Sequence, residues 1–186
     1  RVGEEWQKGR LQVGEEHMAT EVIQEAFIRM RLGRDRESVL SSMSLGERPV
    51  AVVGAAEGDQ HDLGARAVRA ILERDGWRVY FLGGNVPVED FARIQQAQVA
   101  ELVCISFAAG TTLPSLRRAL ETLASLHSPR QPYALAVGGP FDPIASGDLS
   151  TEAFQGFTLS RSAQEFQDWL RSRFPELPGR QSRRIA

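Results

Sequence analysis

The chain has only one cysteine and almost no net charge: among its 186 residues Cys104 is the single thiol, and the formal net charge is −2 at pH 7. A lone cysteine cannot form an intramolecular disulfide, and its apolar neighbours predict a buried thiol. The near-neutral charge does not indicate a nucleic-acid-binding surface. No apolar run approaches the roughly 18 residues of a membrane-spanning helix, and no secretory signal is visible. We therefore expect a soluble, cytoplasmic protein with no membrane partner.

Three common functional motifs are also missing. The sequence has no Gly-x-Gly-x-x-Gly dinucleotide motif, no acidic cluster for Mg²⁺ after its first predicted strand, and no recognisable helix-turn-helix. The first two absences argue against a flavodoxin-like or response-regulator-like function, although such proteins share the fold predicted below. The third absence means that DNA binding would need a further domain or a partner protein. Because the chain begins at Arg1 and not at methionine, we expect it to be part of a longer protein.

What the chain does have is a regular alternation of apolar, β-branched segments and helical patterns. Strands are predicted over residues 50–56, 76–82, 101–106, 133–137 and 154–159, and helices over 61–74, 88–98, 113–126 and 160–174. This order predicts an α/β fold with a doubly wound, five-stranded parallel sheet in the flavodoxin-like order 2-1-3-4-5. Thr112 and Ser160 are predicted to cap the helices that follow them.

Residues 1–46 are predicted to form a helical cap in front of a sheet domain that covers residues 47–174. The segment 33–36 is predicted to divide the cap into two short helices, which cannot bury an apolar face alone. These helices are expected to pack on the sheet domain, on a partner chain or on further helices. Residues 175–186, rich in Pro, Gly and Arg, are predicted to be disordered.

The most informative motif, Asp59-x-His61-x-x-Gly64, lies at the carboxyl end of the first predicted strand, the edge where open α/β sheets bind ligands. A neutral imidazole is a good metal ligand, and its second ring nitrogen needs a partner that fixes the tautomer. Asp59 can accept that N–H, and Gly64 has no side chain to block a close approach to the backbone. On these residues alone, a histidine that merely begins a helix is an equally good interpretation.

Further elements fall at the carboxyl ends of the other predicted strands. The segment Leu82-Gly83-x-x-Val86-Pro87 follows the second strand, Ser106 ends the third, and Gly138-Gly139 follow the fourth. Together with the histidine motif they resemble the cobalamin-binding domains, and the resemblance covers residues 49–140. That family has a Ser-x-Leu element at the third strand, whereas the third residue here is Ala108.

The resemblance implies how such a cofactor is held. In the cobalamin-binding family the motif histidine replaces the cofactor's own benzimidazole as the lower axial ligand of cobalt, which implies His61 as the metal ligand. The displaced nucleotide tail would lie beside Gly64, Ser106, Gly138 and Gly139. The remaining residues of the loop are implied as cofactor contacts: Asp59, Gln60, Asp62 and Leu63.

A second resemblance lies near the start of the chain. Trp6, Val13 and His17 fall on one face of a helix, with Glu16 beside it. Their spacing resembles the Trp…Glu-His motif of LitR/CarH-type photoreceptor regulators, in which a helical bundle covers the upper face of the corrin and contacts the adenosyl group. Adenosylcobalamin is therefore the implied cofactor. Photoreceptors of this type commonly carry a histidine directly after the tryptophan, whereas this chain has Gln7. Without the resemblance, these residues would be interpreted as core positions and a solvated pair.

Two classes of function follow from these resemblances. In the first, the protein is not an enzyme but a cobalamin-dependent sensor. The resemblance implies that it senses light and regulates transcription by changing its assembly as a homo-oligomer. A cobalamin-binding antirepressor that acts through protein contacts is a variant of this class. In the second, it is the corrinoid carrier domain of a methyl-transfer enzyme. The Trp and Glu-His pattern favours the sensor, because a carrier must expose its methyl group to other domains.

Overall fold

The computed structural model describes residues 13–38, 48–107, 110–141, 149 and 151–175. The chain divides into two compact units, residues 1–43 and residues 44–186, which we describe one at a time. Trp6, Gln7 and the predicted disordered tail beyond residue 175 lie outside the described residues. Every helix in the described part of the chain is too short or too polar to span a lipid bilayer.

The first unit contains one long helix, α2, which spans Val13–Ser38. It continues without a break through residues 33–36, so the predicted division into two short helices is wrong at this point. A single interior glycine costs a helix only about 1 kcal/mol, and the arginines around it are good helix formers. Gly33 therefore does not end the helix.

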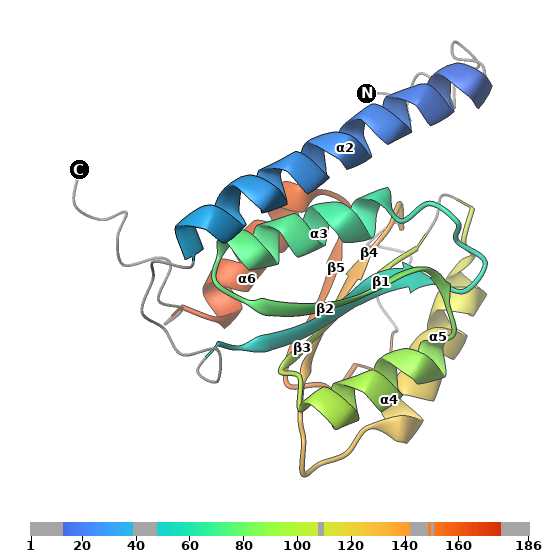
Figure 1. Cartoon of the computed structure of the whole chain (residues 1–186). Coiled ribbons are helices and arrows are strands. Elements are labelled where there is room, and N and C mark those ends of the chain that lie inside the picture. Colours follow the sequence, from blue (N-terminus) through green and yellow to red (C-terminus); the bar gives the residue numbers. More distant parts are fainter. Residues whose placement is uncertain (1–12, 39–47, 108–109, 142–148, 150, 176–186) are drawn as a thin grey trace. The chain divides into compact units, whose positions relative to one another are not determined.

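The second unit is a five-stranded parallel sheet in the order β2-β1-β3-β4-β5, which confirms the predicted doubly wound topology (Figure 1). The strands are β1 (Val50–Ala56), β2 (Arg78–Val86), β3 (Leu102–Ser106), β4 (Ala134–Gly138) and β5 (Phe157–Ser160). A helix crosses back over the sheet between β1 and β2, between β2 and β3, and between β3 and β4, which lets these strands run parallel, and β5 also pairs in parallel with β4. The carboxyl ends of all the strands therefore meet at one edge of the sheet.

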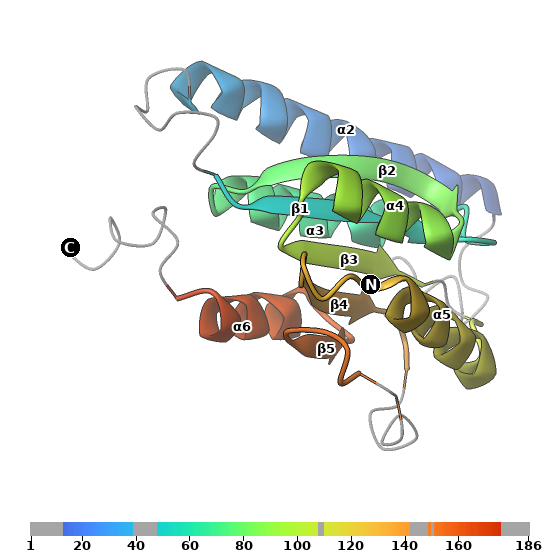
Figure 2. The same cartoon turned by 90° about the horizontal axis from the view of Figure 1, so that it is seen from below.

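Two helices cover each face of the sheet, as the two views in Figures 1 and 2 show. Helices α3 (Leu63–Arg74) and α6 (Ala163–Arg173) lie on one face, and α4 (Val88–Gln98) and α5 (Leu113–Leu126) lie on the other. Thr112 caps α5 as predicted, with its side chain accepting from the Ser115 N–H. The prediction for α6 is wrong by two residues: Ser160 ends β5, and Ser162 is the cap.

Strand β2 is longer than predicted, because residues 83–86 belong to the strand and not to a turn. Gly83 and Asn85 adopt positive φ angles of 84° and 54°, conformations that glycine and asparagine tolerate best. The pairing with β1 shifts register here, from Gly54 opposite Gly83 to Ala56 opposite Val86. This irregular extension brings the end of β2 beside the loop that follows β1.

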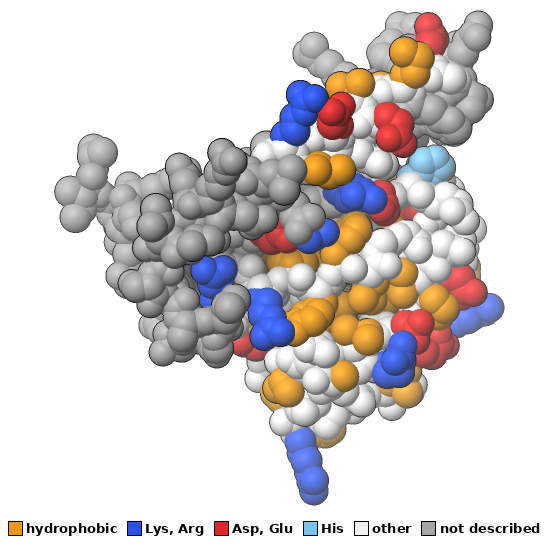
Figure 3. All heavy atoms as spheres, viewed as in Figure 1, with side chains coloured by type: hydrophobic (Ala, Val, Ile, Leu, Met, Phe, Trp, Pro, Cys, Tyr) orange, Lys and Arg blue, Asp and Glu red, His pale blue; other side chains and the backbone are white. Residues whose placement is uncertain are grey.

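Strand β2 also forms one edge of the sheet, and its apolar side chains from Val79 to Leu82 are only half-buried. The guanidinium groups of Arg66 and Arg69 lie over the Phe81 ring, at 5.4 Å and 5.1 Å from its centroid. On the face of the molecule seen in Figure 3, hydrophobic side chains gather in the middle, with acidic and basic side chains around them. Charged side chains on the neighbouring helix thus partly cover this edge.

Candidate functional site

The loop after β1 carries Asp59 and His61, and backbone hydrogen bonds hold it against the end of β2. The Asp59 N–H donates to the Ala56 carbonyl at 3.0 Å, and the Asp59 carbonyl accepts from the Asn85 N–H at 2.8 Å. The Asn85 side-chain oxygen accepts from the Gly58 N–H at 2.8 Å. A Cβ atom on Gly84 would stand 3.1 Å from the Asp59 carbonyl oxygen, so this glycine permits the close approach. The loop is therefore positioned by two strands.

Within this loop Asp59 is buried and His61 is exposed. The side chain of His61 is 67% exposed, whereas that of Asp59 is 4% exposed. One carboxylate oxygen of Asp59 accepts a hydrogen bond from the His61 backbone N–H at 2.8 Å and lies 3.7 Å from the imidazole Nδ1, too far for a hydrogen bond. The other, Oδ2, is buried without a hydrogen-bond partner. The predicted bond from the imidazole to Asp59 stays a prediction, and the carboxylate has a free oxygen to accept it.

Burial raises the pKa of the Asp59 carboxyl group above its ordinary value, and the hydrogen bond from the His61 N–H acts in the opposite direction. A buried carboxylate oxygen without a partner is costly, so such atoms in native proteins call for an explanation. An imidazole N–H turned toward Asp59 would supply the missing donor and leave the other ring nitrogen facing outward.

A cavity of about 370 Å³ opens at the carboxyl edge of the sheet, between the sheet and helices α3 and α6. Its floor consists of two rows of residues that lie side by side across the strands. The inner row is Val53, Cys104 and Ala136, and the row nearer the carboxyl edge is Ser106, Gly138 and Ser160. The side chains of the inner row are apolar and small. Space remains under the helices for this reason.

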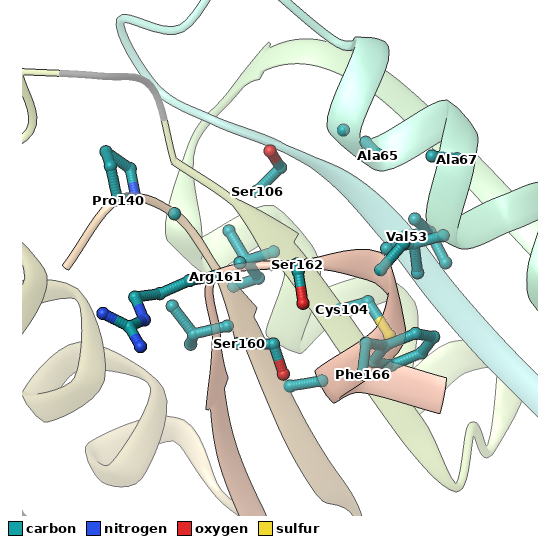
Figure 4. Close-up of a pocket in the computed structure, with 18 residues that line it drawn as sticks. Val53, Ala65, Ala67, Cys104, Ser106, Pro140, Ser160, Arg161, Ser162 and Phe166 are labelled. Atoms are coloured by element: carbon teal, nitrogen blue, oxygen red, sulfur yellow. The ribbon is translucent and has the colours of Figure 1, made fainter. Parts of the chain in front are cut away.

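Helices α3 and α6 supply the walls of the cavity. Gly64, Ala65 and Val68 come from the first turns of α3, and Phe166 comes from α6. Figure 4 shows Val53, Cys104 and Phe166 grouped toward one side of the cavity, and Ser106, Pro140 and Arg161 toward the other. The side of the cavity near Val53 is therefore apolar, the Ser106 hydroxyl lies on the other side, and Ser160 and Ser162 lie between them (Figure 4).

The glycines predicted for the site have different roles. A Cβ atom on Gly64 would stand 2.8 Å from the Ser106 hydroxyl oxygen, so Gly64 allows α3 to approach that hydroxyl. A Cβ on Gly138 would meet no atom within 4 Å, which leaves open space beside this backbone. A Cβ on Gly139 would stand 2.6 Å from the Phe141 ring. Gly64 and Gly138 thus shape the cavity, whereas Gly139 accommodates an aromatic ring.

Some of the other predicted residues lie near the cavity, and the side chains of the rest are outside the part of the chain that the structure describes. Gln60 is exposed, Leu63 is half-buried, and the Asp62 carboxylate accepts a hydrogen bond from Arg66 at 2.8 Å. The side chains of Val13, Glu16 and His17 in α2 lie outside the described set, as does Trp6. The structure therefore brings together the residues from Asp59 to Gly139 and leaves the N-terminal group as a prediction.

Several residues of the site were not predicted. Cys104, buried as expected, faces the cavity, and burial raises its pKa. Arg161, Ser162 and Phe166 line the cavity from the start of α6. One signal was available for them, because residues 160–162 follow the last predicted strand and so must reach the same sheet edge. Asn85, which holds the His61 loop, had no such signal, because its role depends on the irregular end of β2.

A family model described as a B12 binding domain matches residues 49–151, and a second model with the same description matches residues 1–30. The first match covers more than half of the chain and includes the His61 loop, Ser106 and the glycine pair. The chain therefore belongs to the B12 binding domain family, and residues 49–151 form a cobalamin-binding domain.

Similar proteins include both corrinoid proteins and a transcriptional repressor. The chain is 29% identical over 122 residues to dimethylamine corrinoid protein 3 of Methanosarcina mazei, covering 66% of this chain and 70% of that protein. It is 29% identical over 126 residues to the HTH-type transcriptional repressor CarH of Myxococcus xanthus, covering 64% of this chain and 39% of that protein. It is 32% identical over 90 residues to dimethylamine corrinoid protein 1 of Methanosarcina acetivorans, covering 48% and 42%. The match thus spans less than half of the last two relatives.

Solved structures support the fold. The monomethylamine corrinoid protein of Methanosarcina barkeri matches with a TM-score of 0.66 and 17% identity, covering 92% of this chain and 76% of that one. A cobalamin-binding protein of Desulfitobacterium hafniense matches with a TM-score of 0.56 and 22% identity, with the same coverage. At these identities the likeness concerns the architecture of the chain.

The described residues fit a cobalamin in two respects. A corrin ring supplies its own equatorial nitrogens and needs only one protein ligand, for which the exposed His61 is suited. The cavity beside Ser106 and Gly138 offers room for a nucleotide tail, and Asp59 has an oxygen ready to orient an imidazole.

Proposed function

We propose that His61 is the lower axial ligand of a cobalamin cobalt and that Asp59 orients it. The supporting observation is the pairing of an exposed imidazole with a buried carboxylate that has one oxygen free. An imidazole whose Nδ1–H is donated to that oxygen keeps its Nε2 lone pair for the metal, and the carboxylate makes the ring more basic. The backbone anchors from Ala56 and Asn85 hold the loop still, so little conformational entropy is lost when the ligand binds.

In this proposal the nucleotide tail of the cofactor occupies the cavity between the sheet, α3 and α6. The cavity begins at Gly64, within the same motif as His61, and the two sites are therefore continuous along the chain. Ser106 has a half-buried hydroxyl at this point, and Gly138 leaves space beside its backbone. Both residues belong to the row of the floor nearest the carboxyl edge, where a tail would enter.

At the level of the whole protein, we propose a sensor that regulates transcription through a change of assembly, and not an enzyme. The Trp6, Val13, Glu16 and His17 pattern and the similarity to CarH support this function. Bound adenosylcobalamin would supply a light-sensitive cobalt–carbon bond. The N-terminal residues would form the wall around its adenosyl group and pass its loss to a homo-oligomeric interface, while DNA contact would come from a further domain or a partner. A ligand shifts such an equilibrium only by its differential affinity for the two states.

A second candidate is a corrinoid carrier domain in a methyl-transfer system. It is favoured by the similarity to the dimethylamine corrinoid proteins, one of which aligns over 70% of its own length. The two candidates differ in what happens above the corrin, because a carrier must leave a methyl group accessible, whereas a sensor encloses its upper ligand. The His61 site is common to both.

The ligation proposal is tested by the absorption spectrum of the purified protein with cobalamin. Replacing His61 with Ala should change the spectrum to that of a form without a protein imidazole. Asp59→Asn should keep imidazole ligation but weaken affinity about 10- to 100-fold, the usual cost of losing an orienting partner. Arg66→Gln is the control, because it removes a charge near the loop without touching His61 or Asp59. Unchanged spectra and affinity in His61→Ala would exclude this histidine as the ligand.

The sensor proposal is tested by size-exclusion chromatography with adenosylcobalamin, in darkness and after green light. Wild type should elute differently under the two conditions, and Trp6→Ala should bind the cofactor but lose the difference. Identical elution of wild type, with photolysis verified by the spectrum, would contradict the sensor and favour the carrier. In that case methylcobalamin bound to the protein should react with an added methyltransferase partner.

A further inference from the structure

We infer that the tail cavity selects among cobamides by the polarity of the lower base, and that the inner row Val53, Cys104 and Ala136 is the cause of this selectivity. The inference rests on the proposed function, because it assigns a ligand class to the cavity in which the tail is placed. The expected ligands are cobamides whose base has an apolar edge, such as a benzimidazole or a phenol. Cobamides with adenine as the base are expected to bind more weakly.

The inner part of the cavity has few groups that could pair with a polar base. Val53, Cys104 and Ala136 are neighbours across β1, β3 and β4, each is at most 4% exposed, and all belong to one buried apolar cluster. Ala65 and Phe166, 1% and 3% exposed, close the same space from α3 and α6. The backbone N–H and C=O groups of the strands beneath are used in the sheet. A base placed here would meet carbon atoms and one thiol.

The hydroxyl groups of the described lining lie in the outer row or at the helix start, and two of the three already have partners. Ser160 lies 3.2 Å from the Thr158 hydroxyl, and Ser162 accepts from the Glu165 N–H at 3.2 Å. The Ser106 hydroxyl, and the O–H of Ser162 that the cap does not use, remain to bind polar atoms of a tail. Burial also raises the pKa of Cys104, so its thiol stays neutral and is only a weak hydrogen-bond donor.

Adenine carries an exocyclic amine and several ring nitrogens, whereas dimethylbenzimidazole and p-cresol present methyl groups and ring edges. A polar atom that enters the cavity without a partner loses its hydrogen bonds to water, and that loss lowers affinity by about tenfold or more. Sites that cannot pair a polar group discriminate against it for this reason. The hydroxyl groups of Ser106 and Ser162 cannot satisfy the exocyclic amine and all the ring nitrogens of adenine at once, and the Arg161 side chain is exposed.

The affinity comparison needs two probes whose bases bind cobalt weakly or not at all, so that release of the base from cobalt contributes little to the difference in affinity. The two probes are therefore the p-cresolyl cobamide, whose base has no nitrogen that could bind cobalt, and the adeninyl cobamide, whose base binds cobalt weakly. Their affinities for the full chain are measured by absorption titration, with cobinamide, which lacks a tail, as the reference. Wild type should bind the cresolyl form about tenfold or more tightly than the adeninyl form.

The cause is tested by adding a hydroxyl group to the inner row. Ala136→Ser and Cys104→Ser are both small changes that place a hydroxyl in the cavity. Each substitution should lower the ratio of the cresolyl to the adeninyl cobamide affinity about two- to tenfold, the range expected for one new hydrogen bond. Ala134→Ser is the matched control: Ala134 lies on the same strand and the same face but does not line the cavity, so its ratio should stay that of wild type. Circular dichroism verifies that each variant is folded. If one of the two cavity variants does not fold, the other is sufficient for the test.

The possible outcomes distinguish a failure of the selectivity from a failure of cobalamin binding itself. Equal wild-type affinities for the two cobamides, or an unchanged ratio in the folded cavity variants, would overturn the inference and leave cobalamin binding intact. Binding of cobinamide without either complete cobamide would also overturn it, because the cavity would then not be the tail site. Failure of the wild type to bind any of the three probes would contradict the proposed function itself.

Discussion

The two faces of the central sheet are made of alternate residues of the same strands, yet they differ in the size of the side chains that the strands present. On the α4/α5 face the strands present Val52, Val103 and Leu135 to large partners such as Phe91 and Leu120, and these side chains are at most 1% exposed. On the α3/α6 face the same strands present mainly alanine, valine and cysteine, and a cavity of about 370 Å³ remains at the carboxyl edge. The difference teaches that side-chain size, and not topology, determines which face can accept a ligand.

Buried polar atoms on the two faces differ as well. Gln95, 1% exposed on the α4/α5 face, donates to the carbonyls of Ala100 at 2.9 Å and Gln131 at 3.2 Å. One carboxylate oxygen of Asp59, at the edge of the cavity, has no hydrogen-bond partner. The buried hydroxyl of Tyr133 on the α4/α5 face also has none. An orphaned atom alone therefore does not mark a site. Asp59 is distinguished by the exposed imidazole beside it at the carboxyl edge.

The largest expected effect is a loss of stability from a substitution on the α4/α5 face. Leu135→Ala should lower the free energy of unfolding by about 2–5 kcal/mol, because the truncated side chain leaves a cavity that its packed neighbours cannot close. Leu135 is 0% exposed. The loss is measured by denaturant unfolding of the apoprotein, and the folded fraction should bind cobalamin as wild type does. A loss below about 1 kcal/mol would mean that this face is not tightly packed.

A substitution at Ala136, one residue further along the same strand, is expected to change stability less and to lower cobalamin affinity instead. Ala136→Leu directs added carbon atoms into existing space, so its effect on the free energy of unfolding should stay below about 1.5 kcal/mol. Cobalamin affinity should fall about 10- to 100-fold, because the filled cavity would be overpacked by the tail at about 1–3 kcal/mol. Cobinamide, without a tail, is the control ligand and should bind normally. An equal loss for both ligands would mean that Ala136 does not act through the tail.

The smallest expected effects compare one helix cap from each face. Ser162 caps α6 and Thr112 caps α5, accepting from backbone N–H groups at 3.2 Å and 3.3 Å. Ser162→Ala and Thr112→Ala should each cost about 1 kcal/mol of unfolding free energy. Only Ser162 lines the cavity, so Ser162→Ala alone should also reduce cobalamin affinity, by a few-fold. Equal affinities in the two variants would remove the start of α6 from the binding site.

Most of the fold could be predicted because its signals are local. Apolar, β-branched runs and the helical patterns between them were sufficient for five strands, their parallel order and the cap at Thr112. The placement of Asp59, His61 and Ser106 at one edge of the sheet could also be predicted, because the carboxyl ends of parallel strands must meet; their role as cofactor contacts stays a prediction. The errors at Gly33, at the end of β2 and at Ser160 arose where a glycine or serine suits both a turn and a regular element.

The residue order was thus enough to specify the sheet, the edge at which its strands end and the histidine that lies in the loop at this edge, since each depends on neighbours within a few positions. Side-chain packing across strands decided the rest: the row of Val53, Cys104 and Ala136 beneath the cavity, the support of Asn85 for the His61 loop, and the different uses of Gly138 and Gly139. These features join residues far apart along the chain, and register and close packing are settled only when the strands and helices come together.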